Sequence, residues 1–148
     1  KSWDQISSIV RDFKKNNRKI IFSNGCFDIL HIGHVKYLEK AKSFGDILIL
    51  GLNSDKSVRR LKGRNRPINS QEDRAYILAS IEVVDYVVIF DEDTPIKLIE
   101  LIQPDILVKG SDYKGKEITG KHIAKELILV NFINGKSTSK IIERIQKK

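Results

Sequence analysis

The sequence predicts an α/β protein built on a doubly wound sheet of five parallel strands in a single domain. Five short β-favouring segments alternate with helical segments, an order typical of parallel sheets with right-handed crossovers. One of these segments, residues 46–52, is apolar almost throughout, as expected for a strand that is covered on both faces. The length of 148 residues fits one domain, with a helix at 1–17 and a core at 19–146.

The strands are predicted from short apolar and β-branched runs that are bounded by turn residues. They cover residues 19–23, 46–52, 86–90, 106–109 and 127–132. Parallel sheets of this kind bind ligands beyond the carboxyl ends of their strands. A ligand is therefore expected at the loop after the first strand, at residues 62–69, after Lys109 and at residues 135–139.

The helices are predicted from apolar residues at intervals of three and four, most of them behind a capping residue. Ser2, Ser70 and Ser137 are the expected N-caps of the first, fourth and last helices. Thr94 is expected to cap the fifth, with Pro95 at its first helical position. The apolar faces expected for the fourth and last helices consist of Ala75, Ile77, Leu78 and Ile81, and of Ile141, Ile142 and Ile145.

Composition excludes several classes of protein. No apolar run approaches the roughly 20 residues of a membrane span, and the basic start lacks the apolar centre of a signal peptide, so a cytoplasmic protein is expected. Cys26 is the single cysteine, which rules out an intrachain disulfide, and we read it as a packing residue. With three histidines, a closed zinc site is not expected, and no metal ligand is assigned.

The formal net charge of +8 fits three interpretations: a nucleic-acid-binding module, a site for a small anion, or a solvated surface. A nucleic-acid module needs aromatic residues for stacking on a basic face. Aromatic residues make up 7% of the chain, and most of them fall on predicted strands or apolar helix faces. Charge alone therefore does not decide between these interpretations, and the aromatic content argues against nucleic acid.

The clearest chemical signal is residues 24–34, at the end of the first strand and the start of the next helix. His31 and His34 are three residues apart, so both imidazoles can point to the same side. Gly33 between them allows a ligand to approach the backbone, and the helix start offers unpaired amides to a phosphate. This pattern predicts an anion-binding site. A metal site at the two histidines has less support because no third ligand falls at an obvious place.

These residues resemble the cytidylyltransferase-like nucleotidyltransferase superfamily, whose first signature runs G-x-F-D-x-x-H-x-G-H. The matching residues are Gly25, Phe27, Asp28, His31, Gly33 and His34. The second signature of the superfamily is matched by residues 137–141, with a serine at one threonine position. The resemblance implies a Rossmann-like fold and transfer of a nucleoside monophosphate, with release of pyrophosphate.

Three further segments resemble the adenylyltransferases that make ADP-heptose from ATP and a heptose 1-phosphate. They are residues 60–74, 91–95 and 107–113. Glycerol-3-phosphate cytidylyltransferases, the alternative, usually carry an arginine shortly before the second signature, where this chain has residues 131–136. Lys136 is the residue that would replace that arginine. The string His31 to His34 also occurs in class I aminoacyl-tRNA synthetases, but the chain has no room for a tRNA-reading domain.

The resemblance also implies roles for individual residues. His31 and His34 would contact phosphate, and Lys62 would supply a mobile positive charge. Arg66 and Arg74 are weaker substrate-binding candidates that would otherwise order the loop or pair with surface acids, and Asp28 would orient the turn or act as a local cap. The nucleotide-binding candidates are Cys26, Phe27, Gly33, Gly110, Asp112, Ser137, Thr138 and Ser139. The family further implies Mg²⁺ bound through nucleotide phosphates, and a homodimer.

A basic loop follows the third helix. Five positive charges lie within residues 59–66, and Gly63 adds backbone freedom. Mutual repulsion is expected to keep the loop open until a triphosphate supplies negative charge.

Overall fold

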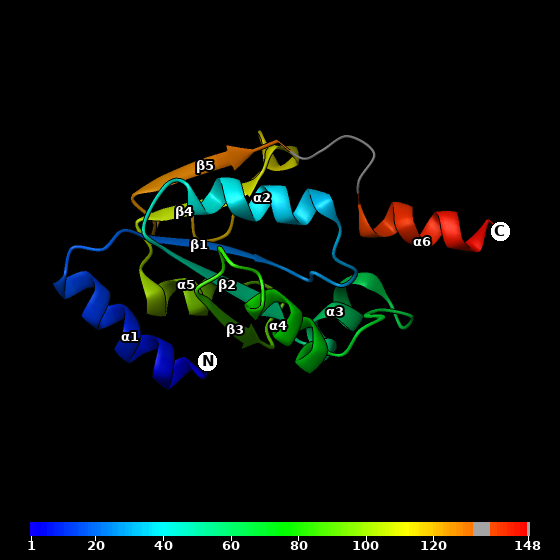
Figure 1. Ribbon diagram of the computed structural model, residues 1–148, viewed down its shortest axis with the longest axis horizontal. Helices are drawn as coiled ribbons and strands as arrows, with labels where there is room; N and C mark the ends of the chain where they lie inside the picture. The colour runs from blue at the N-terminus through cyan, green and yellow to red at the C-terminus, as the bar shows by residue number, and fades with distance from the viewer. Residues whose placement is uncertain (132–136, 148) are drawn as a thin grey trace.

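A computed structural model describes residues 1–131 and 137–147 (Figure 1). Five parallel strands form one sheet in the order β3-β2-β1-β4-β5, which confirms the predicted architecture. Their bounds are β1 Ile20–Gly25, β2 Ile47–Asn53, β3 Tyr86–Phe90, β4 Ile106–Gly110 and β5 Glu126–Val130. Each lies close to a predicted strand, although Phe132, placed in the last strand from the sequence, lies outside the described residues.

Helices cover both faces of the sheet. The helices of the described residues are α1 Trp3–Lys15, α2 Ile32–Lys42, α3 Asp55–Lys62, α4 Gln71–Ala79, α5 Ile96–Ile102 and α6 Thr138–Gln146, with a short 3₁₀ helix η1 at Ser111–Tyr113. Apolar residues of α2 and α4 pack on one face, and those of α1 and α5 pack on the other. Ile20 and Phe22 of β1 point to the α1 side while Ile21 points to the α2 side, as the period of two in a strand requires. The N-terminal helix is therefore part of the core.

Three of the four predicted caps are confirmed. The hydroxyls of Ser2, Ser70 and Ser137 accept backbone N–H groups at the starts of α1, α4 and α6. The cap predicted at Thr94 is wrong, because Pro95 is the N-cap residue of α5 and makes no side-chain hydrogen bond there. The chain thus enters α5 one residue later than expected, and Pro95 is buried at the cavity wall.

The apolar faces predicted for α4 and α6 are only partly correct. Ile77 is exposed, because Arg74 and Leu78, one turn apart, form the buried stripe of α4. In α6 no described residue is buried, and Ile145 is exposed. Figure 1 shows why: α6 projects beyond the carboxyl ends of the strands and does not lie against a sheet face.

Buried polar groups connect the two central strands. The hydroxyl of Tyr37 donates to the Val108 carbonyl of β4 at 3.1 Å and lies 2.9 Å from the Ser23 hydroxyl of β1. All three groups are shielded from water, so each needs such a partner.

Replacing Tyr37 by Phe should therefore lower the free energy of unfolding by about 1–3 kcal/mol, since the Val108 carbonyl and Ser23 hydroxyl would lose a buried partner. Urea unfolding followed by circular dichroism measures the change. Tyr76→Phe is the matched control, because Tyr76 is 78% exposed and its loss of a hydroxyl should have little effect. Equal stability of the two variants would contradict the role given to Tyr37.

Candidate active site

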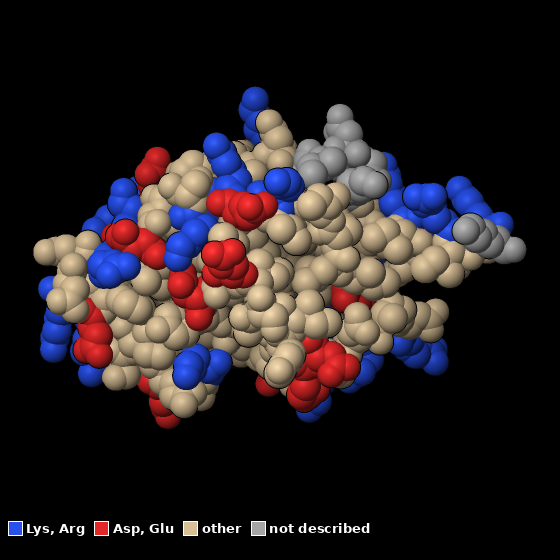
Figure 2. All heavy atoms as spheres, in the orientation of Figure 1, with Lys and Arg blue, Asp and Glu red and all other residues tan. Residues whose placement is uncertain are grey.

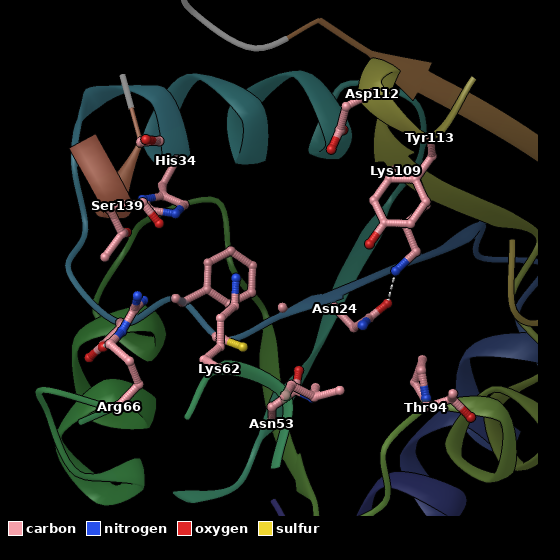
Figure 3. A pocket seen from close by; sticks show the side chains of 18 of the residues that line it. Asn24, His34, Asn53, Lys62, Arg66, Thr94, Lys109, Asp112, Tyr113 and Ser139 are labelled. Carbon is pink, nitrogen blue, oxygen red and sulfur yellow. Dashed lines mark hydrogen bonds and ion pairs between the residues drawn. The ribbon is translucent and has the colours of Figure 1, made fainter. Parts of the chain in front are cut away.

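A cavity of about 740 Å³ opens at the carboxyl ends of the strands (Figure 3). Its walls come from all the segments that the sequence singled out: the turn after β1, the end of α3, residue 66, η1 and the start of α6. Predicted site residues that line it are Cys26, Phe27, Asp28, His31, His34, Lys62, Arg66, Asp112, Ser137, Thr138 and Ser139. Gly33, Gly110 and Arg74 do not line it.

The two histidines form the start of α2. His31 is the N-cap residue, and its Nδ1 accepts the Gly33 N–H at 3.0 Å, while Nδ1 of His34 accepts the His31 N–H at 3.3 Å. A neutral imidazole that accepts at Nδ1 carries its proton on Nε2. The reciprocal cap thus places the proton of a neutral His34 on Nε2, and the two ring centroids are 4.0 Å apart.

Burial, with His31 as a second cause, lowers the pKa of His34 from 6.5 to about 4. His34 is therefore neutral at pH 7 in the empty site and offers a hydrogen bond in place of a charge. Its ring also lies 5.6 Å from the ring of Phe27, which has a left-handed backbone (φ 46°). A side chain at Gly25 would meet the Phe27 ring at 3.1 Å, which explains a glycine at that position of the turn.

The start of α6 reaches the same site from the far end of the chain. The Thr138 hydroxyl donates to the Ile29 carbonyl at 2.9 Å, which ties α6 to the turn before His31. Ser137 caps α6 through its own hydroxyl. The Thr138 hydroxyl already donates, whereas Ser137 only accepts, so α6 can present its first amides, the Ser137 O–H and the exposed Ser139 to a ligand. The two signatures, more than 100 residues apart, are in direct contact.

Asp28 has a wider role than the local cap considered for it. Its carboxylate accepts the Arg66 guanidinium at 2.9 Å and the backbone N–H groups of Ile68 and Asn69 at 2.8 and 2.9 Å. Burial alone would raise the pKa of Asp28, but these hydrogen bonds outweigh it, so the pKa is lowered. Asp28 is fully enclosed and fastens the turn after β1 to a segment 40 residues later.

Arg74 also joins separate segments of the chain by hydrogen bonds, and it lies outside the cavity. It is 1% exposed and donates to the carbonyls of Cys26, Asn53 and Asn69 and to the Asp55 carboxylate. Its guanidinium therefore supports the floor of the site from outside the cavity, and its ion pair, one of the alternatives considered for it, is with the partly exposed Asp55. Burial, offset in part by nearby cations, raises the pKa of the Cys26 thiol, which fits its assignment as a packing residue.

The basic loop is more restrained than its charge suggested. Helix α3 extends to Lys62, and Arg60 pairs with Asp93 at 2.7 Å. Asp28 holds the loop at residues 66–69, so the exposed segment that can move is residues 62–65. Lys62 is the first residue of this short exposed segment, and it lines the cavity.

Several cavity residues were missed from the sequence. Asn24, Asn53 and Lys109 line it near the carboxyl ends of β1, β2 and β4. Their shared signal is a polar side chain that ends an apolar strand, which is where an open parallel sheet binds ligands. Lys136, proposed to replace the cytidylyltransferase arginine, lies outside the described residues.

Residues 22–144 match the cytidylyltransferase-like family. The chain is 62% identical over 146 residues to the bifunctional protein HldE of Nitratiruptor sp., covering 99% of this chain and 32% of that protein. It is 58% identical over 142 residues to HldE of Helicobacter pylori, covering 96% of this chain and 31% of that protein. The chain thus spans about a third of the length of these relatives.

Two solved structures share the fold. A lipopolysaccharide core biosynthesis protein from Thermoplasma volcanium superposes with a TM-score of 0.63 at 29% identity, covering 78% of this chain and 97% of that chain. Pantoate-beta-alanine ligase from Francisella tularensis also gives a TM-score of 0.63 at 19% identity, covering 99% of this chain and 78% of that chain, and supports the fold alone.

Asp28→Asn should lower the free energy of unfolding by about 3 kcal/mol at pH 7, because it leaves the enclosed Arg66 without its counter-charge. A carboxylate whose pKa is lowered by folding stabilises the protein above its unfolded pKa and loses that effect as pH falls through the folded value. The gap between wild type and variant should therefore narrow below about pH 4.

Chemical denaturation at a series of pH values measures both effects. Asp93→Asn, which removes a solvent-exposed ion pair with Arg60, is the control and should cost at most about 1 kcal/mol. A pH-independent gap for Asp28→Asn would show that the charge of Asp28 is not what holds the segment.

Proposed function

Because the chain belongs to the cytidylyltransferase-like family, we propose that it is a nucleotidyltransferase that moves AMP from ATP to a heptose 1-phosphate. The products would be ADP-heptose and pyrophosphate, for synthesis of bacterial surface polysaccharide. The observation that carries the proposal is the meeting of His31 and His34 with the start of α6 at one cavity. High identity to HldE proteins and the likeness to a lipopolysaccharide core biosynthesis protein support a sugar phosphate as acceptor.

The reaction needs no nucleophile from the protein. A phosphate oxygen of the sugar phosphate, ionised near neutral pH, attacks the α-phosphorus of ATP. The bond from this phosphorus to the oxygen that bridges to the β-phosphate breaks, and pyrophosphate leaves with that electron pair. Catalysis then consists of alignment and stabilisation of charge on the phosphate oxygens.

The residues present suit that task. The imidazoles of His31 and His34 and the amides at the start of α6 would donate to phosphate oxygens, and His34, being neutral, needs no counter-ion in the empty site. Lys62, on its short exposed segment, would add a charge when the triphosphate arrives. Arg66 is held by Asp28, so it contributes a fixed positive potential at the cavity wall.

Mg²⁺ is expected with ATP. Among residues 1–131 and 137–147, no three His, Cys, Asp or Glu side chains gather to hold a metal ion. Mg²⁺ usually binds nucleotides through the phosphates and water, so we assign it no protein ligand. When bound, Mg²⁺ would neutralise part of the triphosphate charge.

A nucleic-acid-binding module has less support. On the face shown in Figure 2, basic side chains are interspersed with acidic ones over most of the surface, and they gather without acidic neighbours mainly at the end where α6 lies.

Within the described part of the chain, no helix is long and apolar enough to cross a membrane. A homodimer, implied by the resemblance, stays a prediction.

The purified protein should form ADP-heptose and pyrophosphate from ATP and a heptose 1-phosphate, and Mg²⁺ should be required. A pyrophosphate-release assay that crosses ATP, CTP, GTP and UTP with both anomers of the heptose 1-phosphate and with glycerol 3-phosphate tests this. Faster turnover of CTP with glycerol 3-phosphate would overturn the choice of substrates and leave the nucleotidyltransferase assignment intact.

His34→Ala should lower kcat about 100-fold or more with a smaller change in KM, because its donor is most useful when charge shifts toward the leaving pyrophosphate. Steady-state kinetics on folded protein, checked by circular dichroism, measure the effect. His122→Ala, at a position outside the cavity, is the matched control. An unchanged kcat in a folded His34 variant would remove this residue from the mechanism.

A further inference from the structure

The two central strands separate where the cavity begins. β1 and β2 stay paired to Gly25 and Leu52, and β4 and β5 stay paired to Gly110 and Val130. β1 and β4 pair at only two positions of their described register, ending at Phe22 and Leu107. Beyond that point side chains bridge the gap: first Tyr37, and then Lys109, whose ammonium donates to the Asn24 side-chain carbonyl.

Lys109 is an enclosed cation in this gap. It is 7% exposed, yet it lines the cavity. Burial lowers its pKa to about 8, although the nearby Asp112 raises it in part. Within the described residues no carboxylate lies close enough to form an ion pair with it. An enclosed charge is costly unless it is paired, and Asp112 offsets the burial of the Lys109 ammonium only in part, so an anionic ligand would stabilise it further.

The surroundings of Lys109 leave room for such a ligand. An ammonium has three N–H donors. Asn24 accepts one, and the Tyr113 ring lies over the ammonium at 5.5 Å. A further donor can therefore turn to an oxygen in the cavity. A nucleobase or a ribose carries no charge that would offset an enclosed cation, whereas a phosphate does.

Two anions must meet in this one cavity, and its cations form two groups. In Figure 3, His34, Lys62, Arg66 and Ser139 lie on one side of the view, while Lys109, Asn24, Tyr113 and Asp112 lie on the other. The first group contains both signatures and suits the triphosphate. In an in-line displacement the attacking oxygen approaches from the side opposite the leaving pyrophosphate. The acceptor phosphate therefore belongs on the Lys109 side.

Building on the proposed function, we propose that Lys109 binds the phosphate of the sugar phosphate acceptor and holds its attacking oxygen next to the α-phosphorus. Asp112, on the same side, is then placed to accept hydrogen bonds from sugar hydroxyls. This differs from the nucleotide-binding role that the resemblance implied for Asp112.

Lys109→Met, which removes the charge and keeps the length, should raise the KM for the acceptor about 10- to 100-fold and change the KM for ATP less than about 3-fold. Lys109→Arg should restore part of the acceptor affinity. Lys36→Met is the matched control, because Lys36 is exposed on α2 and pairs with Glu39 at the surface. Calorimetric titration of the acceptor into protein with a non-hydrolysable ATP analogue checks that KM reports binding.

A rise confined to the acceptor supports the proposal. An equal rise for both substrates, or a rise for ATP alone, overturns it, since a residue that only joins β1 to β4 would affect both. If the wild type prefers CTP and glycerol 3-phosphate, the proposed function fails, and the same comparison with that pair still tests Lys109. If the wild type turns over none of these substrate pairs, calorimetric titration compares the affinity of wild type and Lys109→Met for glycerol 3-phosphate. Equal affinity would overturn the proposal.

The pH dependence of wild-type acceptor binding gives a second readout if Lys109→Met does not fold. Affinity should fall as pH rises through about 8, where Lys109 loses its proton. The other titratable groups around it are Asp112 and Tyr113 of η1 and Tyr37 of α2, and burial raises the pKa of Tyr37 so that it stays neutral. The acceptor phosphate is already doubly ionised there. Constant affinity from pH 7 to 9 would overturn the proposal.

Discussion

The separation of β1 from β4 is the constraint on which the site depends. In the strand order β3-β2-β1-β4-β5, β2 and β3 are added on one side of β1 and then β4 and β5 on the other, and an open parallel sheet has a crevice where the direction reverses. The pairing of β1 with β4 ends at Phe22 and Leu107, and Tyr37 fills the gap with a buried hydroxyl. The residues that line the cavity lie at the carboxyl ends of the strands or on the segments that follow them.

The charges around the cavity differ in how they are held. His34 is kept neutral by burial, Arg66 is held in place by its ion pair with Asp28, and Lys109 is enclosed with an amide and a ring as its partners. Lys62 is exposed on its short segment. The empty site therefore limits repulsion among its own cations, while its amides and Nε2–H groups keep their positions for an anion. This arrangement suits a reaction whose barrier lies mainly in bringing two phosphates together.

Much of the fold followed from sequence patterns. Strands covered on both faces are continuous apolar runs in the sequence, and helix starts are marked by capping serines. The signature histidines were found from their local spacing, and residues 137–139 from the resemblance to the second signature of the superfamily. The partners of Arg74 and Asp28 could not be named from the sequence, because they are 5 to 48 residues away, at distances that no periodicity reports. Lys109 was overlooked as a site residue for the same reason: its enclosure arises only when two strands diverge.

The polar network around Asp28 and Arg74 lies on one flank of the cavity, joining the turn after β1 to α3, α4 and residues 66–69. On the other flank, residues 111–125 are held by local turns and by the buried Ile118, with most side chains in water between 112 and 117. The two flanks can therefore vary separately. Substitutions in residues 112–117 can alter the ligand preference of the cavity while the hydrogen-bonded flank keeps its geometry, so one fold can be adapted to different ligands during evolution.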